Sequence, residues 1–338
     1  MGYRIALMGA GRIGSMHGFL LRAMQSRVES IVVCDTNTEK AELLAAQLDA
    51  DVASSEQVYA SGNPLGIDAL VLATPTSEHA AGLIAAAQAG LPTFCEKPLA
   101  MDIESAQAAC QAVEAAQLPH HIGFQRRFDV GYRRARQAVR DGALGEVHRF
   151  HMLTADQFPP DDAFIPTSGG IFRDCNIHDF DIIAWVTGQP VVEVYATGVT
   201  RGREVFAAYN DPSEAAAILT LADGTIGTVH ASRYNGQGYD VRLDLAGTRG
   251  SVNVGYDARV PLVVMDDGVE FPPHAPWTDF IERFQPCYER ELSAFLDMLD
   301  THGPSPCTAR DALAALYVAV ACDLSRREHR PVRLEEIR

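Results

Sequence analysis

The chain has 338 residues, of which 47% are hydrophobic and 21% are charged. That length and composition are typical of a globular protein with two ordinary domains. Because 28 basic residues stand against 44 acidic ones, the net charge is −16, which argues against a protein that binds the phosphate backbone of a nucleic acid.

The seven cysteines are scattered and form no C-x-x-C pair, which predicts reduced thiols rather than disulfides or a zinc site. The N-terminus enters an apolar run at once and has no signal-peptide pattern. No apolar run reaches the roughly 18 residues that a membrane-spanning helix needs. We therefore expect a cytoplasmic protein with no metal and no membrane partner.

Tyr3–Met8 is a compact apolar run typical of a buried parallel strand, and a helix is expected to end near Met24. Between them lies a G-x-G-x-x-G pattern, which favours a dinucleotide: the glycines permit a tight turn, a close approach to the pyrophosphate and close packing of helix on strand. The free N–H groups of the helix N-terminus attract phosphate. The pattern is made of Gly9, Gly11, Arg12, Ile13 and Gly14.

A second apolar strand, residues 30–34, ends in Asp35, which lies 35 − 14 = 21 residues beyond Gly14. That spacing is typical of the acid that binds the ribose hydroxyls of the cofactor. Its carboxylate would repel a 2′-phosphate, and the residues that follow offer no arginine to bind one. The sequence therefore predicts NAD rather than NADP. In the alternative interpretation, Asp35 only caps the helix that begins near Asn37.

The alternation of strands and helices continues, with a third strand at residues 68–73. The turn after it, Ala73, Thr74 and Pro75, would lie where open α/β sheets bind cofactors. His79 follows at the start of a helix and is predicted to face the cofactor; the alternative is a solvated histidine.

A fourth strand begins at Thr93 and ends in Glu96-Lys97-Pro98. A lysine at this edge of a parallel sheet, near cofactor charge, can hydrogen-bond a substrate oxygen. Glu96 and Lys97 are therefore expected in the cofactor site. The alternative is a surface ion pair, which contributes little to stability. A helix at 102–117 and a short strand at 119–123 would complete this domain.

The pattern changes after residue 124. Residues 126–141 predict a helix rich in arginine, and residues 145–153 predict a strand. An arginine-rich helix can bind nucleic acid, but the acidic net charge favours a bridging helix with local salt links.

Paired glycines at 169 and 170 precede Asp174 and His178, which are four residues apart and would share a face on the first turn of a helix. A carboxylate beside a histidine orients the imidazole and raises its pKa, as an acid/base for a hydroxyl proton needs. The alternatives are a zinc site, for which no third ligand recurs at metal spacing, and a helix cap beside a structural histidine.

The remainder is rich in strands, predicted at 191–198, 214–221, 225–234, 239–246 and 250–254. Asp223-Gly224 indicates a hairpin turn. Tight turns between successive strands predict an antiparallel sheet, which can cover a substrate on one face and a second subunit on the other. Residues 277–300 and 308–326 predict closing helices.

The G-x-G-x-x-G turn, Glu96-Lys97-Pro98 and Asp174-x-x-x-His178, in this order, resemble the glucose-fructose oxidoreductase/inositol dehydrogenase/MocA family over essentially the whole chain. The segments at 123–129 and 170–181 are most similar to its inositol dehydrogenase branch. The resemblance implies an α/β fold: an N-terminal Rossmann domain (residues 1–123) and a C-terminal α/β domain on an open, mostly antiparallel sheet (residues 124–338), with C-terminal helices that can pack back on the first domain. It also implies a homodimer or homotetramer joined through that sheet.

The resemblance further implies roles in the site. Lys97 would hydrogen-bond the reacting hydroxyl, His178 would remove its proton, and Asp174 would bind substrate and tune His178. Arg127, Asp156 and Tyr234 would bind the other hydroxyls, and the loop at 157–168 would shape the pocket. The expected activity is NAD-dependent oxidation of a polyol or sugar, with myo-inositol or a related cyclitol as leading substrate. The alternatives are a 3-keto sugar oxidoreductase, an NAD-dependent glycosidase and a non-catalytic NAD-binding sensor.

Overall fold

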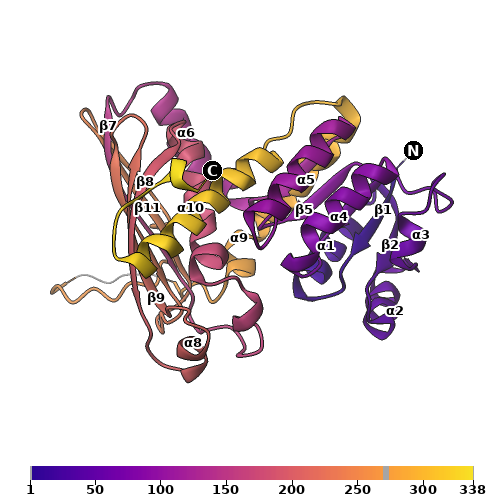
Figure 1. The fold of residues 1–338 in the computed structure, drawn as a ribbon, viewed down its shortest axis with the longest axis horizontal. Helices are drawn as coiled ribbons and strands as arrows, with labels where there is room; N and C mark the ends of the chain where they lie inside the picture. The colour runs from indigo at the N-terminus through magenta and orange to yellow at the C-terminus, as the bar shows by residue number, and fades with distance from the viewer. Residues whose placement is uncertain (1, 269–273, 338) are drawn as a thin grey trace. The chain divides into compact units, whose positions relative to one another are not determined.

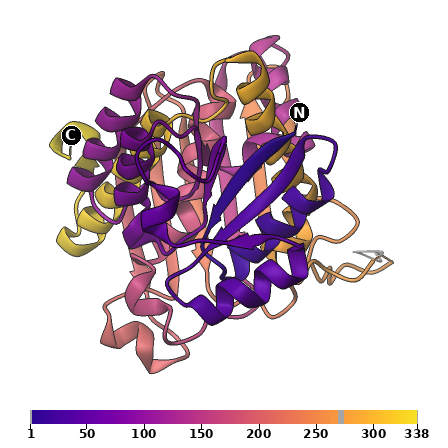
Figure 2. The same ribbon diagram turned by 90° about the vertical axis from the view of Figure 1, so that its right-hand side faces the viewer.

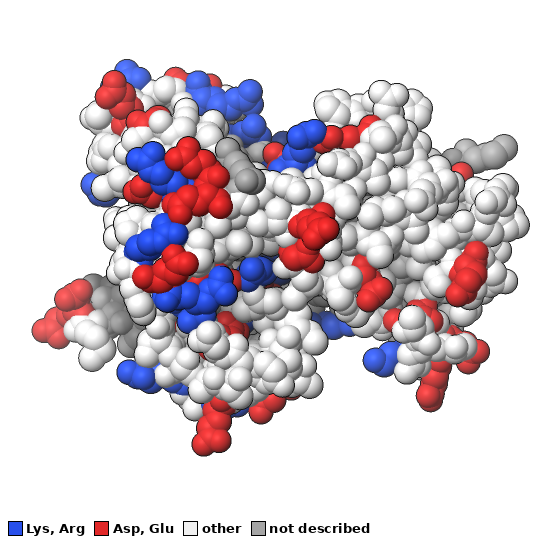
Figure 3. All heavy atoms as spheres, in the orientation of Figure 1, with Lys and Arg blue, Asp and Glu red and all other residues white. Residues whose placement is uncertain are grey.

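The computed structural model describes residues 2–268 and 274–337. It divides into two compact units: Met1–Gln125 with Tyr288–Leu313, and Arg126–Cys287 with Ala314–Arg338. Within the described residues, no helix is long and apolar enough to cross a membrane. Basic and acidic side chains are interspersed on the face drawn in Figure 3, and no continuous basic patch appears on that face.

The first unit is built on a six-stranded parallel sheet in the order β3-β2-β1-β4-β5-β6. Its strands β1, β2 and β5 are labelled in Figure 1. The central strands β1 and β2 run side by side (Figure 2). Because β1 is followed by α1 and β4 lies on its other side, the strand order reverses at β1, where open α/β sheets bind ligands. The elements of this unit are β1 Tyr3–Met8, α1 Arg12–Ala23, β2 Val28–Cys34, α2 Thr38–Leu48, β3 Asp51–Val52, α3 Ser55–Val58, β4 Ala69–Leu72, α4 Thr76–Ala89, β5 Thr93–Glu96, α5 Ile103–Ala116 and β6 His120–Gly123.

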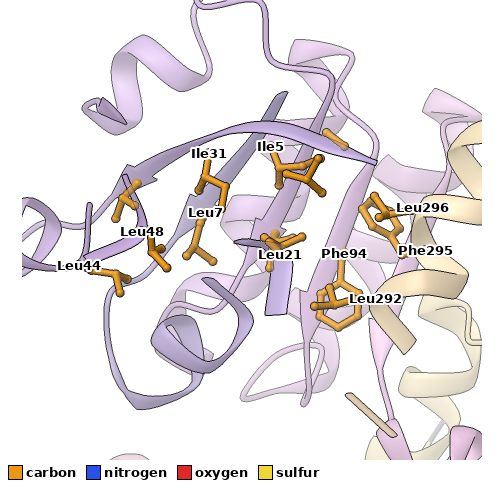
Figure 4. Packing of buried hydrophobic residues seen from close by; sticks show 14 of the residues in the cluster. Ile5, Leu7, Leu21, Ile31, Leu44, Leu48, Phe94, Leu292, Phe295 and Leu296 are labelled. Carbon is orange, nitrogen blue, oxygen red and sulfur yellow. The ribbon is translucent and has the colours of Figure 1, made fainter. Parts of the chain in front are cut away.

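Alternate residues of the central strands form the hydrophobic core on one face of this sheet. Ile5 and Leu7 of β1 pack with Leu21 of α1 and Leu48 of α2, and Phe94 of β5 joins the same cluster (Figure 4). The chain returns to this core much later, with Leu292, Phe295, Leu296 and Leu299 of α9 (Phe280–Thr301). Burial of these side chains fixes the sheet, so the loops at its carboxyl edge are held on a rigid frame.

The second unit is built on a seven-stranded sheet in the order β12-β11-β7-β10-β9-β8-β13. Its β7–β10 pair is parallel and the other pairs are antiparallel. Its elements are α6 Val130–Arg140, β7 Val147–Ala155, a π-helical turn Phe172–Asn176, α7 Ile177–Thr187, β8 Val191–Val199, α8 Glu204–Ala208, β9 Glu214–Leu221, β10 Ile226–Ser232, β11 Asp240–Gly247, β12 Ser251–Val254 and β13 Val332–Arg333; α10 spans Ala309–Glu328.

Two expectations about this unit need correction. β10 and β11 follow each other in sequence but do not pair, because β7 lies between them and pairs with both. The arginine-rich helix does not begin at residue 126: Gln125–Phe128 is a 3₁₀ turn, and α6 begins after Asp129, whose carboxylate accepts hydrogen bonds from the backbone N–H groups of Gly131 and Tyr132. The β9–β10 hairpin forms as expected around Gly224, whose φ is +87°.

Candidate active site

The glycine-rich turn connects β1 to α1, and two of its glycines are required by the fold itself. Gly9 has φ +102°, and a Cβ there would lie 2.4 Å from the carbonyl oxygen of Ala73. A Cβ on Gly14 would lie 1.9 Å from the carbonyl oxygen of Gly9. Any larger side chain at either position would push β1, α1 and the loop after β4 apart.

Gly11 differs from the other two glycines. It precedes α1 in an extended conformation (φ −77°, ψ −172°), and no protein atom lies within 4 Å of the place where its Cβ would be. The protein therefore does not require glycine there, and the space beside it is open. The exposed Arg12 and half-buried Ile13 start the helix, and the first turn carries no acidic residue. An open space at the N-terminus of a helix whose first turn carries no acidic residue suits the phosphates of a dinucleotide.

Asp35 lies at the end of β2 and is half-buried. Its Oδ2 accepts a hydrogen bond of 2.7 Å from the backbone N–H of Ala10, and its Oδ1 accepts one of 2.8 Å from that of Asn37. The carboxylate therefore lies directly beside the glycine-rich turn. The helix-cap interpretation is wrong, because the N-cap of α2 is Asn37, whose Oδ1 accepts from the N–H of Lys40.

The turn after β4 is held by His79. This side chain is 1% exposed, so the expectation that it faces a cofactor needs correction, and it is not solvated either. Its Nδ1 lies 2.7 Å from the carbonyl oxygen of Pro98, and its Nε2 lies 2.9 Å from that of Thr74. Burial lowers the pKa of His79, and the two carbonyls oppose that shift. His79 thus connects the loop after β4 to the turn after β5, while Ala73 and Thr74 are half-buried and Pro75 is exposed.

Glu96 and Lys97 lie at the end of β5, before a cis peptide bond to Pro98. Glu96 is 8% exposed, and its Oε1 lies 2.6 Å from Nε2 of His17, while its Oε2 accepts from the backbone N–H of Lys97 at 3.2 Å. The surface ion-pair interpretation is therefore wrong for Glu96, whose carboxylate orients the Lys97 backbone from inside the unit. Lys97 itself is half-buried.

His17 was not among the residues predicted from the sequence. It is fully buried on the face of α1 that also carries Gly14, Gly18 and Leu21. His17 follows Gly14 by about one helical turn, so both lie on the same face of α1. A polar residue on the buried face of that helix was the available signal.

In the second unit, the expected α-helical turn that carries Asp174 is a π-helical turn, Phe172–Asn176, which continues into α7. Gly169 and Gly170 lead into it with φ +78° and +90°, and the Gly170 carbonyl accepts from the N–H of Asp174 at 2.9 Å. His178 lies in the first turn of α7 and is 9% exposed. π-Helical turns interrupt helices most often at functional sites.

Asp174 does not cap α7. Its Oδ2 accepts a hydrogen bond of 2.7 Å from Nη1 of Arg233. The same nitrogen lies 3.3 Å from Oδ2 of Asp156, the residue that follows β7. Burial raises the pKa of Asp156, and Arg233 opposes that shift. The structure therefore joins Asp156 and Asp174 through Arg233, which was not predicted from the sequence. The described ranges contain no group of three or more His, Cys, Asp or Glu placed to hold a metal ion.

Arg126 and Arg127 do not lie on an exposed basic helix. Arg126 is 1% exposed and its Nη1 lies 2.5 Å from Oδ1 of Asp179, while Arg127 is 6% exposed and forms a bidentate ion pair with Asp181 at 2.9 and 2.5 Å. Both acids belong to α7. Arg127 was expected to bind substrate, but its guanidinium faces Asp181 inside the unit. Together the two pairs anchor the helix that carries His178.

Tyr234 is 38% exposed, and its hydroxyl accepts a hydrogen bond of 3.0 Å from the backbone N–H of Arg203. The Arg203 side chain in turn holds the loop expected to shape the pocket, with Nη1 at 2.6 Å from Oδ1 of Asp162 and Nη2 at 2.5 Å from the carbonyl oxygen of Pro160. Tyr234 and this loop are therefore connected through Arg203, a second arginine that was not predicted from the sequence.

Comparison with known proteins extends these observations over the whole chain. The model of an oxidoreductase family with an NAD-binding Rossmann fold, GFO/IDH/MocA, matches residues 3–124, and the model of the GFO/IDH/MocA C-terminal domain matches residues 132–253. The inositol 2-dehydrogenase of Rhizobium meliloti (strain 1021) is 32% identical over 335 residues, which are 98% of this chain and 99% of that protein.

Two solved structures show the same fold along their full length. A myo-inositol dehydrogenase from Corynebacterium glutamicum is 30% identical, with a TM-score of 0.88 and 99% of each chain covered. The scyllo-inositol dehydrogenase from Lactobacillus casei, solved with NAD(H) and scyllo-inositol, is 26% identical, with a TM-score of 0.87, 99% of this chain and 100% of that chain covered.

Proposed function

Because the chain belongs to the GFO/IDH/MocA family of NAD-binding oxidoreductases, we propose that it oxidises a secondary hydroxyl of a cyclitol or related polyol to the ketone, with myo-inositol as leading substrate. One observation carries the proposal: Asp174 and His178 lie on one helical segment, with Asp174 bound to Arg233, in a chain similar to inositol dehydrogenases over its full length. A carboxylate and a histidine placed in this way suit removal of a hydroxyl proton.

The first unit fits NAD. The open space beside Gly11 and the N-terminus of α1 would take the pyrophosphate. The Asp35 carboxylate, beside Ala10, would accept hydrogen bonds from the adenosine ribose hydroxyls and disfavour a 2′-phosphate. The bound nicotinamide supplies a hydride acceptor at its C4 carbon. The chain supplies the binding, the orientation and the handling of the proton.

The catalytic set we propose is Lys97, Asp174 and His178. The Lys97 ammonium donates a hydrogen bond to the reacting hydroxyl oxygen and stabilises negative charge that develops there. His178 takes the hydroxyl proton while the carbon loses hydride. Asp174 binds the substrate and keeps the imidazole basic. The hydroxyl carbon would give up a hydride and the hydroxyl oxygen would give up its proton. Polyol and oxidised cofactor would therefore give ketone, reduced cofactor and one proton.

Asp156 and Tyr234 would bind the other hydroxyls of the substrate. We do not include Arg127 among the substrate-binding residues, because its guanidinium is paired with Asp181 inside the second unit. A site that hydrogen-bonds several ring hydroxyls discriminates stereoisomers strongly, since a missing hydroxyl leaves a buried polar group without its partner.

A panel of cyclitols, aldoses and amino sugars, assayed with NAD and NADP side by side, tests the proposal. We expect reduced cofactor with NAD and at least one cyclitol, and a lower kcat/KM with NADP. Absence of turnover across the panel would contradict the proposal. A dominant preference for NADP would contradict the role given to Asp35. Cofactor that stays bound with no net reduction would favour a 3-keto sugar enzyme or an NAD-dependent glycosidase.

We propose further that the protein forms a homodimer or homotetramer through one face of the second sheet. We call this the outer face, because large apolar side chains are exposed on it. Tyr195 of β8, Ile218 of β9 and Ile226 of β10 are 41%, 51% and 55% exposed on its strands. Tyr195 and Ile218 are register partners, so their side chains form one apolar surface. All seven cysteines are buried free thiols, which supports a cytoplasmic location.

A further inference from the structure

Arg233 is a buried charged residue beside the acids of the proposed substrate site, at 2% exposure. Its Nη1 has three neighbours: Oδ2 of Asp174 at 2.7 Å, Oδ2 of Asp156 at 3.3 Å and Sγ of Cys175 at 3.0 Å. One buried guanidinium nitrogen thus contacts two carboxylates and the thiol of Cys175. A cation in this place acts on both acids at once.

The backbone fixes where this guanidinium starts. Ser232 pairs with Ala155 in the parallel β7–β10 ladder, so Arg233 and Asp156 are the next residues along two neighbouring strands. The N–H of Asp156 donates to the carbonyl of Ser232, and the N–H of Arg233 donates to that of Ser213. The backbone of Arg233 is therefore held directly after the end of β10, while Asp174 belongs to a π-helical turn outside the sheet.

Two other nitrogens of the Arg233 guanidinium form no hydrogen bond with the described residues. Nε and Nη2 are buried and have no hydrogen-bond partner among residues 2–268 and 274–337. Leaving buried donors unsatisfied is costly. Burial disfavours the charged form, yet Asp174, Asp156 and Cys175 raise the pKa of Arg233, so it stays a cation. The two acids are half-buried, with 24% and 19% of their side chains exposed.

We propose that Arg233 is the positioning residue of the substrate site: it fixes the Asp174 carboxylate on the π-helical turn, places a positive charge between it and Asp156, and sets the distance between the two acids. This inference rests on the proposed function, because it assigns those acids to the substrate. Arg233 does not touch the substrate in this account. It acts through Asp174 on the proton-accepting His178, and through Asp156 on the hydroxyl that Asp156 binds.

A structural ion pair would give a different result from a positioning residue. The test compares Arg233→Lys, which keeps the charge but loses the planar fork, with Arg233→Gln, which keeps donors but loses the charge. Arg233→Met loses both. Arg134→Met, at an exposed position of α6, is the matched control. We expect kcat to fall roughly tenfold to a hundredfold in the Gln and Met variants, less than the 10²–10⁴-fold that loss of an acid/base group costs. The Kd for NAD should stay unchanged.

The pH dependence separates the two accounts. Without the cation, both carboxyls take up a proton at higher pH, so the acidic limb of the kcat profile moves to higher pH in Arg233→Gln and stays in place in Arg233→Lys. The Lys variant should raise KM instead, because an ammonium cannot hold both acids in the same geometry. Identical acidic limbs in the Lys and Gln variants would overturn the proposal, and these two variants decide it even where Arg233→Met does not fold.

A measurement without substrate keeps this inference separate from the proposed activity. Carbon-13 NMR titration of the aspartate carboxyls, in protein free of cofactor and polyol, can be assigned with Asp156→Asn and Asp174→Asn. We expect both titrations to move to higher pH in Arg233→Gln. Shifted titrations without turnover on any polyol would contradict the proposed function alone. Turnover with titrations equal to those of the parent protein would contradict the role of Arg233 alone.

Discussion

Lys97 and Lys40 are the only lysines in the chain, so 26 of its 28 basic residues are arginines. An arginine side chain stays charged and is suited to planar ion pairs, whereas a lysine ammonium is compact and shares its proton more readily. Arginine performs the structural pairing in this protein, as Arg126 and Arg127 show. The lysine at the end of β5 is the one whose ammonium we propose to bind the reacting oxygen.

Lys97→Met and Lys97→Arg should both lose roughly 10²–10⁴-fold in kcat, because neither side chain can place an ammonium on the reacting oxygen. Steady-state kinetics on the polyol that turns over and calorimetric binding of NAD measure the two effects, and the Kd for NAD should remain close to that of the parent protein. Lys40→Arg, on the exposed surface of α2, is the control. An active Lys97→Arg would show that only a positive charge is needed there.

Individual residues of the site were predictable where the signal is local. Asp35 was singled out by its spacing along the chain from the glycine-rich turn. In the structure its carboxylate accepts a hydrogen bond from the backbone N–H of Ala10. Arg233 and the buried pairing of Arg127 could not be found in this way, because their partners lie 54 to 77 positions away in the chain. His79 was misjudged because its ring contacts are backbone carbonyls, which leave no trace in side-chain patterns.

The turn between β1 and α1 offers a paired test of fold against cofactor. Gly14→Ala should lower the melting temperature strongly, because its Cβ would overlap the carbonyl of Gly9. Gly11→Ala should leave the melting temperature almost unchanged, since its Cβ meets no protein atom, yet weaken NAD binding. Thermal unfolding and NAD titration of both variants check this. Full NAD affinity in Gly11→Ala would show that the pyrophosphate does not lie there.

The loops after β4 and β5 should respond to pH through His79. Its pKa is lowered in the folded state, so the unfolded chain takes up a proton first, at about pH 6.5. Its contribution to stability is therefore fully present above about pH 6.5 and is lost as the pH falls toward the lower folded pKa. Urea unfolding at about pH 7.5 and about pH 5.5 should show a smaller difference for His79→Gln than for the parent protein.

The exposed His148 is the control for this experiment, as His148→Gln. A pH dependence of His79→Gln equal to that of the parent protein would contradict the account of His79, because other groups would then supply the whole effect.

Helices and strands with strong local patterns were predicted well, and pairings between distant strands were not. The buried strands of the first sheet have apolar runs that suffice to identify them. The insertion of β7 between β10 and β11 depends on contacts across more than 70 residues, for which a single sequence carries no signal. The π-helical turn at Phe172–Asn176 was also not predictable, since one extra residue in a turn does not change the apolar face of α7.

The proposed assembly through the second sheet is testable on its outer face. Ile218→Asp introduces a charge in the middle of the exposed apolar surface of β9, so we expect it to reduce the molar mass measured by size-exclusion chromatography with light scattering. Leu43→Asp, at a residue 64% exposed on α2 in the first unit, is the control. A parent protein that is already monomeric would contradict the proposed assembly.

Family membership and fold class were accessible from sequence because the diagnostic motifs lie in order along the whole chain, and two family models match its two halves. Substrate identity was less accessible, because in the site we propose it depends on the loop at 157–168 and on Tyr234, which are connected through Arg203. Contacts of that kind discriminate between stereoisomers by single hydrogen bonds.

Transfer of the hydrogen itself tests the central claim most directly. The protein is incubated with NAD and myo-inositol that carries deuterium at carbon 2, and the nicotinamide is recovered and examined by mass spectrometry and proton NMR. We predict that deuterium appears at C4 of the reduced nicotinamide, in an amount equal to the ketone formed. A ketone without deuterium in the nicotinamide, or no reduced nicotinamide from any cyclitol, would contradict the account.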